Sequence, residues 1–422
     1  MTFLLSIFYF LLPFERIPTF EVAGFTVKFS YIVGVILIAY FLAKKPLKVF
    51  KEKPLLLSDK FLILFWAVGS LTIIRAENFK RSAILALLWA FVIIIYLILS
   101  RIIENQKTRE KIENIIIWSA IITSLFGLYQ FIGDSFDLPT KFTGLRYWYT
   151  KEIADLGFPR IQSVALEPLY FSNFLLVPLY LAIKRYFKSG KIFGDHYLTI
   201  VLILINIVLG ISRGAYLGLV VTLTLLLLFT IAKWKVYKTL KPTLFGLGLA
   251  IIISVFLSYV AVNSFNGKDA AANFRSHAIV ADSEEGNSVS GRMESYQEAW
   301  DLFKSNPVMG IGLGNFGATR TYSGDASETN YGAVNNEYLE ILTEIGIVGL
   351  VLFLLFLIFF VKELYNGYKR VDDKGKLWTV LLFLGLVAVF IQYNFFSSLY
   401  IIYIWAYLAL LKSEGNGREE TG

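Results

Sequence analysis

The chain has 422 residues, of which 56% are hydrophobic and 16% aromatic, and its mean hydropathy is +0.62. One soluble core cannot bury this much apolar material, so the composition excludes an ordinary soluble domain and indicates a polytopic membrane protein. The formal net charge is +8, but the basic residues stand in short patches between apolar segments, a pattern that argues against nucleic-acid binding.

The apolar segments predict about twelve membrane spans, since a span needs ~20 mostly apolar residues. The first segment has no cationic start and no small-residue cleavage site, so we expect it to be retained as a span. The predicted spans lie near residues 1–14, 22–43, 60–75, 83–100, 112–132, 168–184, 196–211, 215–232, 243–262, 338–361, 377–396 and 398–411.

Lysine and arginine patches fall in every second connection between these segments. The positive-inside rule places such connections in the cytoplasm, which predicts that both termini of this multi-pass protein are cytoplasmic. The predicted organisation is N-terminal spans (1–132), an extracytoplasmic loop (133–167), central spans (168–262), a large extracytoplasmic loop (263–337), C-terminal spans (338–411) and a polar cytoplasmic tail (412–422).

Few side chains in this sequence could bind a metal or a cofactor. Cysteine is absent, which removes disulfides and thiolate-bound zinc, and only His196 and His277 could supply imidazole. We therefore expect neither a metal nor a cofactor.

Over Asn263 to Ser290 the large loop is expected to be irregular or to form short pieces, and then to form a helix that starts at Arg292 and ends before Pro307. This helix is amphipathic, and it either packs on the bundle or lies in the lipid interface. Its apolar side is formed by Met293, Tyr296, Trp300 and Phe303, and its polar side by Glu294, Glu298, Asp301 and Lys304.

Three arginines stand near predicted outer helix ends: Arg160, Arg213 and Arg292. Arg213 lies in a very short connection between two apolar segments, where a guanidinium is costly unless it is paired or meets an anion. Arginine binds phosphate oxygens in a two-pronged geometry, so the three together predict a site for a lipid-linked diphosphate. The alternative for each is an ordinary surface or snorkelling charge.

The run Gly310 to Gly317 superficially resembles a nucleotide-binding loop. No strand precedes it and no Lys-Ser/Thr pair follows it, so neither the dinucleotide nor the P-loop pattern applies. We expect a tight turn that lets backbone approach backbone, with a backbone N–H anion nest as the alternative.

Carboxylates near outer helix ends are the candidates for proton transfer. They are Glu167, Glu337, Glu340 and Glu344. Glu340 and Glu344 are four residues apart on one helix face, so either could instead pair structurally with an arginine.

These residues resemble the bacterial O-antigen ligase and O-antigen polymerase superfamily of membrane glycosyltransferases. The resemblance spans roughly Arg160 to Gly349. It rests on Ser-Arg-Gly-Ala-Tyr-Leu-Gly-Leu from Ser212, on Gly291-Arg292…Trp300…Asn306-Pro307…Gly310-Ile311-Gly312-Leu313-Gly314-Asn315, and on Asn336…Tyr338-Leu339…Glu344-Ile345-Gly346…Gly349.

The resemblance implies an all-α fold of the C-type glycosyltransferase class with a large extracytoplasmic loop domain. It also implies a metal-independent transfer of glycan from undecaprenyl diphosphate to a hydroxyl of a lipid or glycan acceptor, at the outer face of the inner membrane. Arg213 and Arg292 stand where the family's arginines are thought to hold the diphosphate, and Arg160 is predicted to bind the diphosphate with them.

One position departs from the ligase pattern. Where the family's ligases have a histidine taken to be the base, this chain has Asn335, which cannot accept a proton usefully. Glu337, Glu167 or the diphosphate itself would have to act, His277 being a further substitute, unless no strong base is used. The departure argues against a ligase onto lipid A core and raises two alternatives, a repeat-unit polymerase and a ligase with another acceptor. A membrane transporter or flippase is the rival from another class.

Overall fold

The computed structural model describes residues 2–16, 19–22, 25–43, 46–103, 105–278, 287–319 and 333–416. The chain divides into two compact units, each assembled from separate parts of the sequence. Unit 1 comprises Met1–Val35, Gln106–Glu284 and Asp372–Ile391, and unit 2 comprises Ile36–Asn105, Glu285–Val371 and Gln392–Gly422. Helices dominate both units, so the expected all-α architecture is confirmed apart from one two-stranded hairpin.

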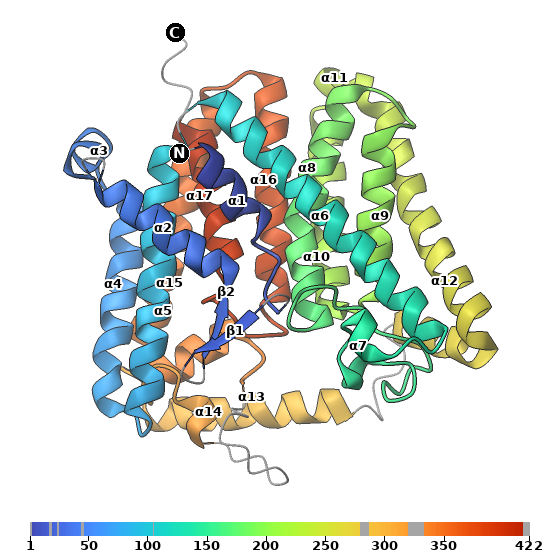
Figure 1. The fold of residues 1–422 in the computed structure, drawn as a ribbon. Coiled ribbons are helices and arrows are strands. Elements are labelled where there is room, and N and C mark those ends of the chain that lie inside the picture. The colour runs from blue at the N-terminus through green and yellow to red at the C-terminus, as the bar shows by residue number, and fades with distance from the viewer. Residues whose placement is uncertain are drawn as a thin grey trace. The chain divides into compact units, whose positions relative to one another are not determined.

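Unit 1 is built around α8, which packs against α9, while α9 packs against α6 and α12 (Figure 1). Its elements are α1 (Thr2–Phe10), β1 (Thr19–Val22), β2 (Phe25–Lys28), the start of α2 (Phe29–Ala43), α6 (Gln106–Ser135), α7 (Thr140–Thr143), the 3₁₀ helix η2 (Tyr147–Tyr149), α8 (Pro168–Ser189), α9 (Asp195–Leu209), α10 (Arg213–Ala232), α11 (Trp234–Tyr237), η3 (Lys238–Leu240), α12 (Lys241–Ala278) and α16 (Asp373–Gln392). The hairpin is antiparallel and pairs Thr19 with Lys28 and Val22 with Phe25.

The end of α12 corrects one expectation. The stretch that begins at Asn263 was expected to be irregular or to form short pieces, yet α12 continues through it to Ala278. The helix is interrupted at Gly267, which has φ 92°, a conformation that costs glycine little. A polar composition therefore marked the interruption of the helix, but not its end. The remainder of the predicted irregular stretch includes 279–286, which lie outside the described residues.

Unit 2 is built on the packing of α15 along α4 and of α17 along α5 (Figure 1). Its elements are the end of α2, α3 (Pro46–Glu52), α4 (Leu57–Leu71), η1 (Thr72–Arg75), α5 (Phe79–Ile102), α13 (Asn287–Ser305), α14 (Phe316–Thr319), α15 (Glu337–Lys369) and α17 (Ile402–Asn416).

The amphipathic helix predicted in the large loop is present as α13, and it packs on α15. Ser295 and Ala299 are buried on its inward side, and Tyr296, from the predicted apolar side, packs against the same core. Met293 and Trp300 are 60% and 48% exposed. The helix is therefore a bundle-packed element that also carries exposed apolar side chains on its flank.

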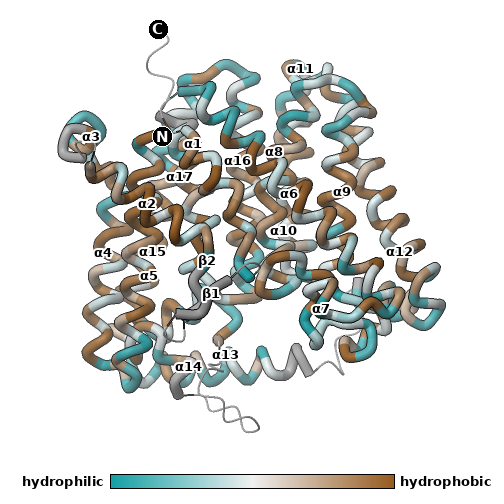
Figure 2. Tube along the Cα trace, viewed as in Figure 1, coloured by the Kyte–Doolittle hydropathy of each residue, from teal (hydrophilic) through white to brown (hydrophobic). Residues whose placement is uncertain are grey.

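Seven described helices are long and apolar enough to cross a membrane, and three shorter apolar helices have 10–17 residues. Figure 2 shows hydrophobic residues along most of α2 and α9, and hydrophilic residues around α7. The seven are Leu57–Arg75, Phe79–Ile102, Gln106–Ser135, Arg213–Ala232, Lys235–His277, Glu337–Lys369 and Asp373–Gln392. A multi-pass membrane protein is thus confirmed, while the count of about twelve spans stays a prediction.

A buried ionic cluster in unit 2 joins α4, α5, α15 and α17. Nζ of Lys412 lies 2.6 Å from Asp59 and 3.2 Å from Glu363, and Arg101 lies 2.8 Å from Asp59. Lys412 is 3% exposed and Asp59 fully buried. The predicted start of the polar tail, residue 412, is therefore too early in the chain. Helix α17 continues to Asn416, and Lys412 belongs to the packed unit.

Candidate functional site

In unit 1, the loop between α6 and α8 is fastened to α6 by one amide side chain. The N–H of Ser163 donates to Oε1 of Gln130 (2.7 Å), and Nε2 of Gln130 donates to the carbonyl of Ser163 (3.1 Å). The Ser163 hydroxyl donates to the carbonyl of Thr123 (2.6 Å). All three residues are buried, and Ser163 has φ 53°, which these bonds hold in place. This fixed point lies between Arg160 and Glu167 in sequence.

Arg160 bonds the turn that follows α9. Its Nε donates to the carbonyl of Gly210 and its Nη2 to that of Ile211, both at 3.0 Å, and its backbone N–H donates to Tyr149 (2.9 Å). Carbonyls at a helix C-terminus lack partners within the helix and favour a cation. At least two of the guanidinium donors of Arg160 are thus directed at the protein, which fits a positioning residue better than a direct phosphate ligand.

The turn held by Arg160 presents Arg213 at the first position of α10. Ile211 in this turn has φ 44°, which is strained for a β-branched residue. A Cβ on Gly210 would lie 2.7 Å from Oγ of Ser172, so the turn sits directly on α8. Arg213 is half-buried and forms no hydrogen bond or ion pair with the described residues. Its five N–H donors are therefore available to a ligand.

Glu167 is the residue before α8, whose first position is Pro168. Its carboxylate is close enough to act on Tyr149: burial, and next the charge of Glu167, raise the pKa of that phenol to about 12. The charges of Arg160 and Arg146 oppose this rise. One end of unit 1 thus brings together two of the predicted residues, Arg160 and Glu167, with the turn that leads to Arg213.

In unit 2, the predicted residues around Asn335 form the start of α15. Asn335 has φ 59°, which asparagine tolerates better than most residues, and its Nδ2 donates to the carbonyl of Ala333 (3.3 Å). Asn336 is the N-cap, and its Oδ1 accepts the N–H of Leu339 (3.0 Å). The two amides therefore shape the turn into the helix.

Tyr296 on α13 connects this turn to the segment before α17, a contact that sequence reasoning did not foresee. Its hydroxyl lies 3.1 Å from the carbonyl oxygen of Asn335 and 2.9 Å from that of Asn394. Arg292 stands one helical turn earlier, half-buried, with no hydrogen bond or ion pair to any described residue. Burial raises the pKa of Tyr296, and the charge of Arg292 opposes the rise, so the guanidinium is near this phenol.

Glu337 is 3% exposed and holds the segment before α17. Its Oε2 accepts the N–H groups of Ser398 (2.5 Å) and Leu399 (2.9 Å), and its own N–H donates to Tyr393 (2.9 Å). These contacts connect the N-terminus of α15 to the segment that leads into the last helix. They fit poorly with a base that must approach a bulky acceptor.

The glycine-rich run is a backbone docking loop, as the sequence predicted. Gly312 donates to the carbonyl of Glu344 (2.9 Å), and a Cβ on Gly310 would lie 2.4 Å from the backbone of Glu344. Opposite this loop, α15 is broken at Gly346, which has φ 76°. The Glu344 carboxylate accepts the N–H groups of Gly314 (2.7 Å) and Phe316 (3.1 Å), so the predicted nest is occupied by the protein's own carboxylate.

The remaining carboxylate, Glu340, accepts the N–H of Val334 (3.2 Å). The charge of Arg81, at the start of α5, acts on both Glu340 and Glu344. This agrees with a structural pairing to an arginine, although the sequence did not identify which one. His277 is also engaged locally, because its Nδ1 lies 2.9 Å from the carbonyl oxygen of Asn273.

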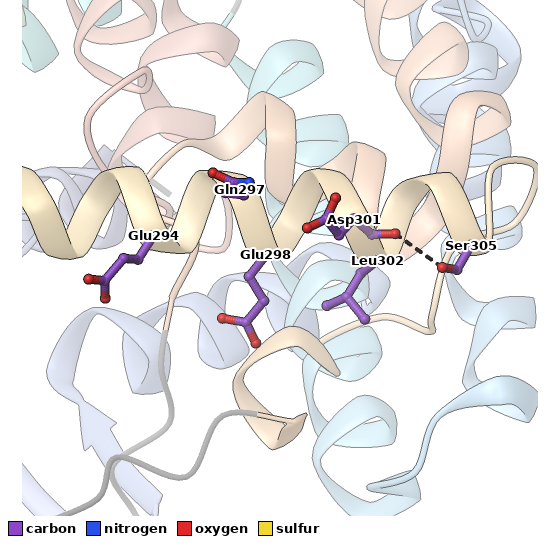
Figure 3. Close-up of a pocket in the computed structure, with 6 residues that line it drawn as sticks. All are labelled: Glu294, Gln297, Glu298, Asp301, Leu302 and Ser305. Carbon is purple, nitrogen blue, oxygen red and sulfur yellow. Dashed lines mark hydrogen bonds between the residues drawn. The ribbon is translucent and has the colours of Figure 1, made fainter.

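The polar side of α13 lines a pocket of about 530 Å³ (Figure 3). The side chains expected on this side, Glu294, Glu298 and Asp301, do line it, together with Gln297, Leu302 and Ser305. The Ser305 hydroxyl donates to the carbonyl of Asp301 (3.1 Å), as α13 ends.

Apolar helices long enough to span a membrane define a multi-pass membrane protein. Residues 198–354 match the family described as O-antigen ligase, a family of glycosyltransferase-like membrane enzymes, and this match agrees with the superfamily that the chain's motifs resemble. The matched region contains Arg213, Arg292, Asn335 and Glu337, whereas Arg160 and Glu167 precede it. No curated protein matches the chain.

Proposed function

We propose that this protein is an O-antigen ligase-like glycosyltransferase with a C-type fold, acting at the outer face of the inner membrane. It transfers a glycan from undecaprenyl diphosphate to a hydroxyl of lipopolysaccharide or a related surface polysaccharide. The observation that carries the proposal is Arg213, which opens a membrane-spanning helix inside the matched region with a guanidinium that no described residue pairs.

The chemistry needs cations where Arg213 and Arg292 are proposed to act. The acceptor oxygen bonds to the anomeric carbon, the bond from that carbon to the diphosphate oxygen breaks, and undecaprenyl diphosphate leaves with the electron pair. Charge therefore grows on the diphosphate, and preorganised guanidinium groups stabilise it. Arg160 supports the step indirectly, since it holds the strained turn before Arg213.

The proton of the acceptor hydroxyl needs a base, and we assign this role to Glu167. Asn335 cannot accept the proton, and Glu337 is committed to two backbone N–H groups. Glu167 is half-buried and stands at a helix end beside Tyr149 and the arginines of unit 1. Its proposed role does not depend on the family's histidine.

Glu167→Gln is expected to lower the rate of transfer by ~10²-fold, the low end for loss of a general base, because the amide cannot take the proton. Glu337→Gln is the matched control. It keeps an oxygen that accepts the N–H groups of Ser398 and Leu399, so transfer should stay within a few fold of the parent. Initial rates with saturating donor measure both. The reverse ranking of the two variants would assign the base to Glu337.

A ligase and a polymerase differ in the glycans that a deletion strain accumulates. Electrophoresis of envelope glycans is expected to show full-length chains that remain on the undecaprenyl carrier, which indicates a ligase. Asn335, in place of the ligase histidine, favours the alternative, a repeat-unit polymerase, for which the strain would show capped but short chains. An unchanged glycan profile would contradict both.

We also propose that the loops 133–167 and 263–337 face away from the cytoplasm, with both termini inside. The alternation of basic connections supports this orientation. Because the chain has no cysteine, a single introduced cysteine is the only thiol that a reagent can label. An impermeant thiol reagent should label Lys141→Cys or Lys304→Cys in intact spheroplasts and leave Lys235→Cys unlabelled. Preferential labelling of Lys235→Cys would show that the orientation is the opposite of the one proposed.

A further inference from the structure

The segment after α1 lies on the loop that carries Arg160 and Glu167. The backbone N–H groups of Glu15 (3.2 Å) and Arg16 (3.0 Å) both donate to the carbonyl of Val164. Nη1 of Arg16 reaches across to the carbonyl of Gly144 (2.6 Å), just after α7. All of these residues belong to unit 1, so the position of the Arg16 guanidinium is fixed from two sides.

Arg146 lies two residues beyond Gly144, whose carbonyl Arg16 contacts, and its charge is close enough to act on the Arg16 guanidinium. Arg146 is half-buried and forms no hydrogen bond or ion pair with the described residues. Burial, and next the charge of Arg146, lower the pKa of Arg16. Two like charges held together while partly desolvated are unfavourable unless an anion is present to offset them.

Two carboxylates lie nearby, Glu167 and Glu15. The charge of Glu167 acts on Tyr149, as that of Arg146 does. Glu15 adjoins Arg16 but is already engaged. Its Oε1 lies 3.1 Å from Nζ of Lys28, and its Oε2 accepts the N–H of Leu166 (3.4 Å). Both Glu15 and Lys28 are buried, so this pair stays closed. Neither Arg16 nor Arg146 forms an ion pair with Glu15 or Glu167 among the residues that the structure describes.

We propose that Arg16 and Arg146 form a second anion site in unit 1, which binds a phosphate group. Two guanidinium groups with free N–H donors offer paired, charge-assisted hydrogen bonds that match tetrahedral phosphate oxygens. The phosphate comes either from a substrate of the transfer reaction or from the headgroup of an anionic phospholipid. The first source rests on the proposed function, whereas binding itself does not.

The test is the affinity of the purified full-length protein for inorganic pyrophosphate, titrated calorimetrically in nanodiscs of zwitterionic phospholipid. Arg146→Gln should weaken binding by about 10-fold or more, because a hydrogen bond to a charged group contributes about 1.5–3 kcal/mol. Arg146→Lys keeps the charge and the fold and should lose several-fold. Lys141→Gln, which removes an exposed cation of the same loop, should change affinity by less than about twofold.

The same titrations in an Arg213→Lys background separate this site from the proposed diphosphate site, because Arg146→Gln should weaken binding there as well. Added anionic phospholipid displaces pyrophosphate from this site if the headgroup is its ligand, and leaves it bound if a reaction substrate is. Equal affinities of the parent, Arg146→Gln and Arg146→Lys, or an equal loss in Lys141→Gln, would overturn the proposal. An absence of glycan transfer by the parent would instead overturn the proposed function.

Discussion

Arg213→Lys should lower glycan transfer by about 10- to 100-fold, although the positive charge is kept. Arg213 opens α10 from a strained turn, and no described residue engages its guanidinium. A diphosphate would receive paired hydrogen bonds from the planar guanidinium, whereas an ammonium is a point charge on a flexible stem. The loss corresponds to about 1.5–3 kcal/mol, the contribution of a hydrogen bond to a charged group.

The rate of transfer at saturating donor measures this effect, and Arg275→Lys is the matched control. Arg275 is an exposed arginine near the end of α12, 5.8 Å from the ring of Tyr259, and lysine can keep that contact. Its transfer rate should equal that of the parent. Near-normal transfer by Arg213→Lys would leave Arg213 as a structural charge that extends to the headgroups.

Lys412→Met should lower the free energy of unfolding of unit 2 by about 3–5 kcal/mol, the range for removing one partner of a buried ion pair. Lys412 contacts Asp59, Glu363, the Ser58 hydroxyl (2.9 Å) and the Tyr96 hydroxyl (3.2 Å). Without its ammonium, Asp59 and Glu363 are left with less compensating charge in a buried site. The methionine fills the space, so the loss is electrostatic rather than a cavity effect.

Denaturant unfolding in mixed micelles measures this difference, with Lys304→Met as control. Lys304 pairs with Asp301 at 2.7 Å, but both side chains are more than half exposed, so the control should change stability by less than about 1 kcal/mol. Equal small losses in both variants would show that the ionic cluster contributes no more than a surface pair.

Local features were predictable because their signal lies in neighbouring residues. The 3.6-residue period predicted α13, and the glycines at 310 and 312 predicted a backbone approach that the contacts with Glu344 confirm. The family resemblance rested on short motifs of this kind, and the match over residues 198–354 agrees with it. The predicted apolar side of α13 was wrong for Met293 and Trp300, which are exposed, because the small residue Ala299 is the one that allows close approach to α15.

Contacts between distant residues could not be predicted in this way. Lys412 lies at the edge of a polar terminus, and its partner Asp59 is 353 positions away, so hydropathy assigned Lys412 to a tail. Arg16 and Arg146 are brought together by the Arg16 contact with Gly144, 128 positions along the chain. Glu337 was read as a candidate base because the sequence does not reveal that its carboxylate accepts two backbone N–H groups.

The most direct test of the proposed activity is transfer by the purified protein in liposomes supplied with an undecaprenyl-diphosphate-linked glycan and a hydroxyl acceptor. The proposal predicts that glycan appears on the acceptor, that undecaprenyl diphosphate is released in equal amount, and that Arg213→Lys loses most of both. Movement of the intact donor across the bilayer, with no glycan on the acceptor and no free undecaprenyl diphosphate, would contradict it and indicate a transporter.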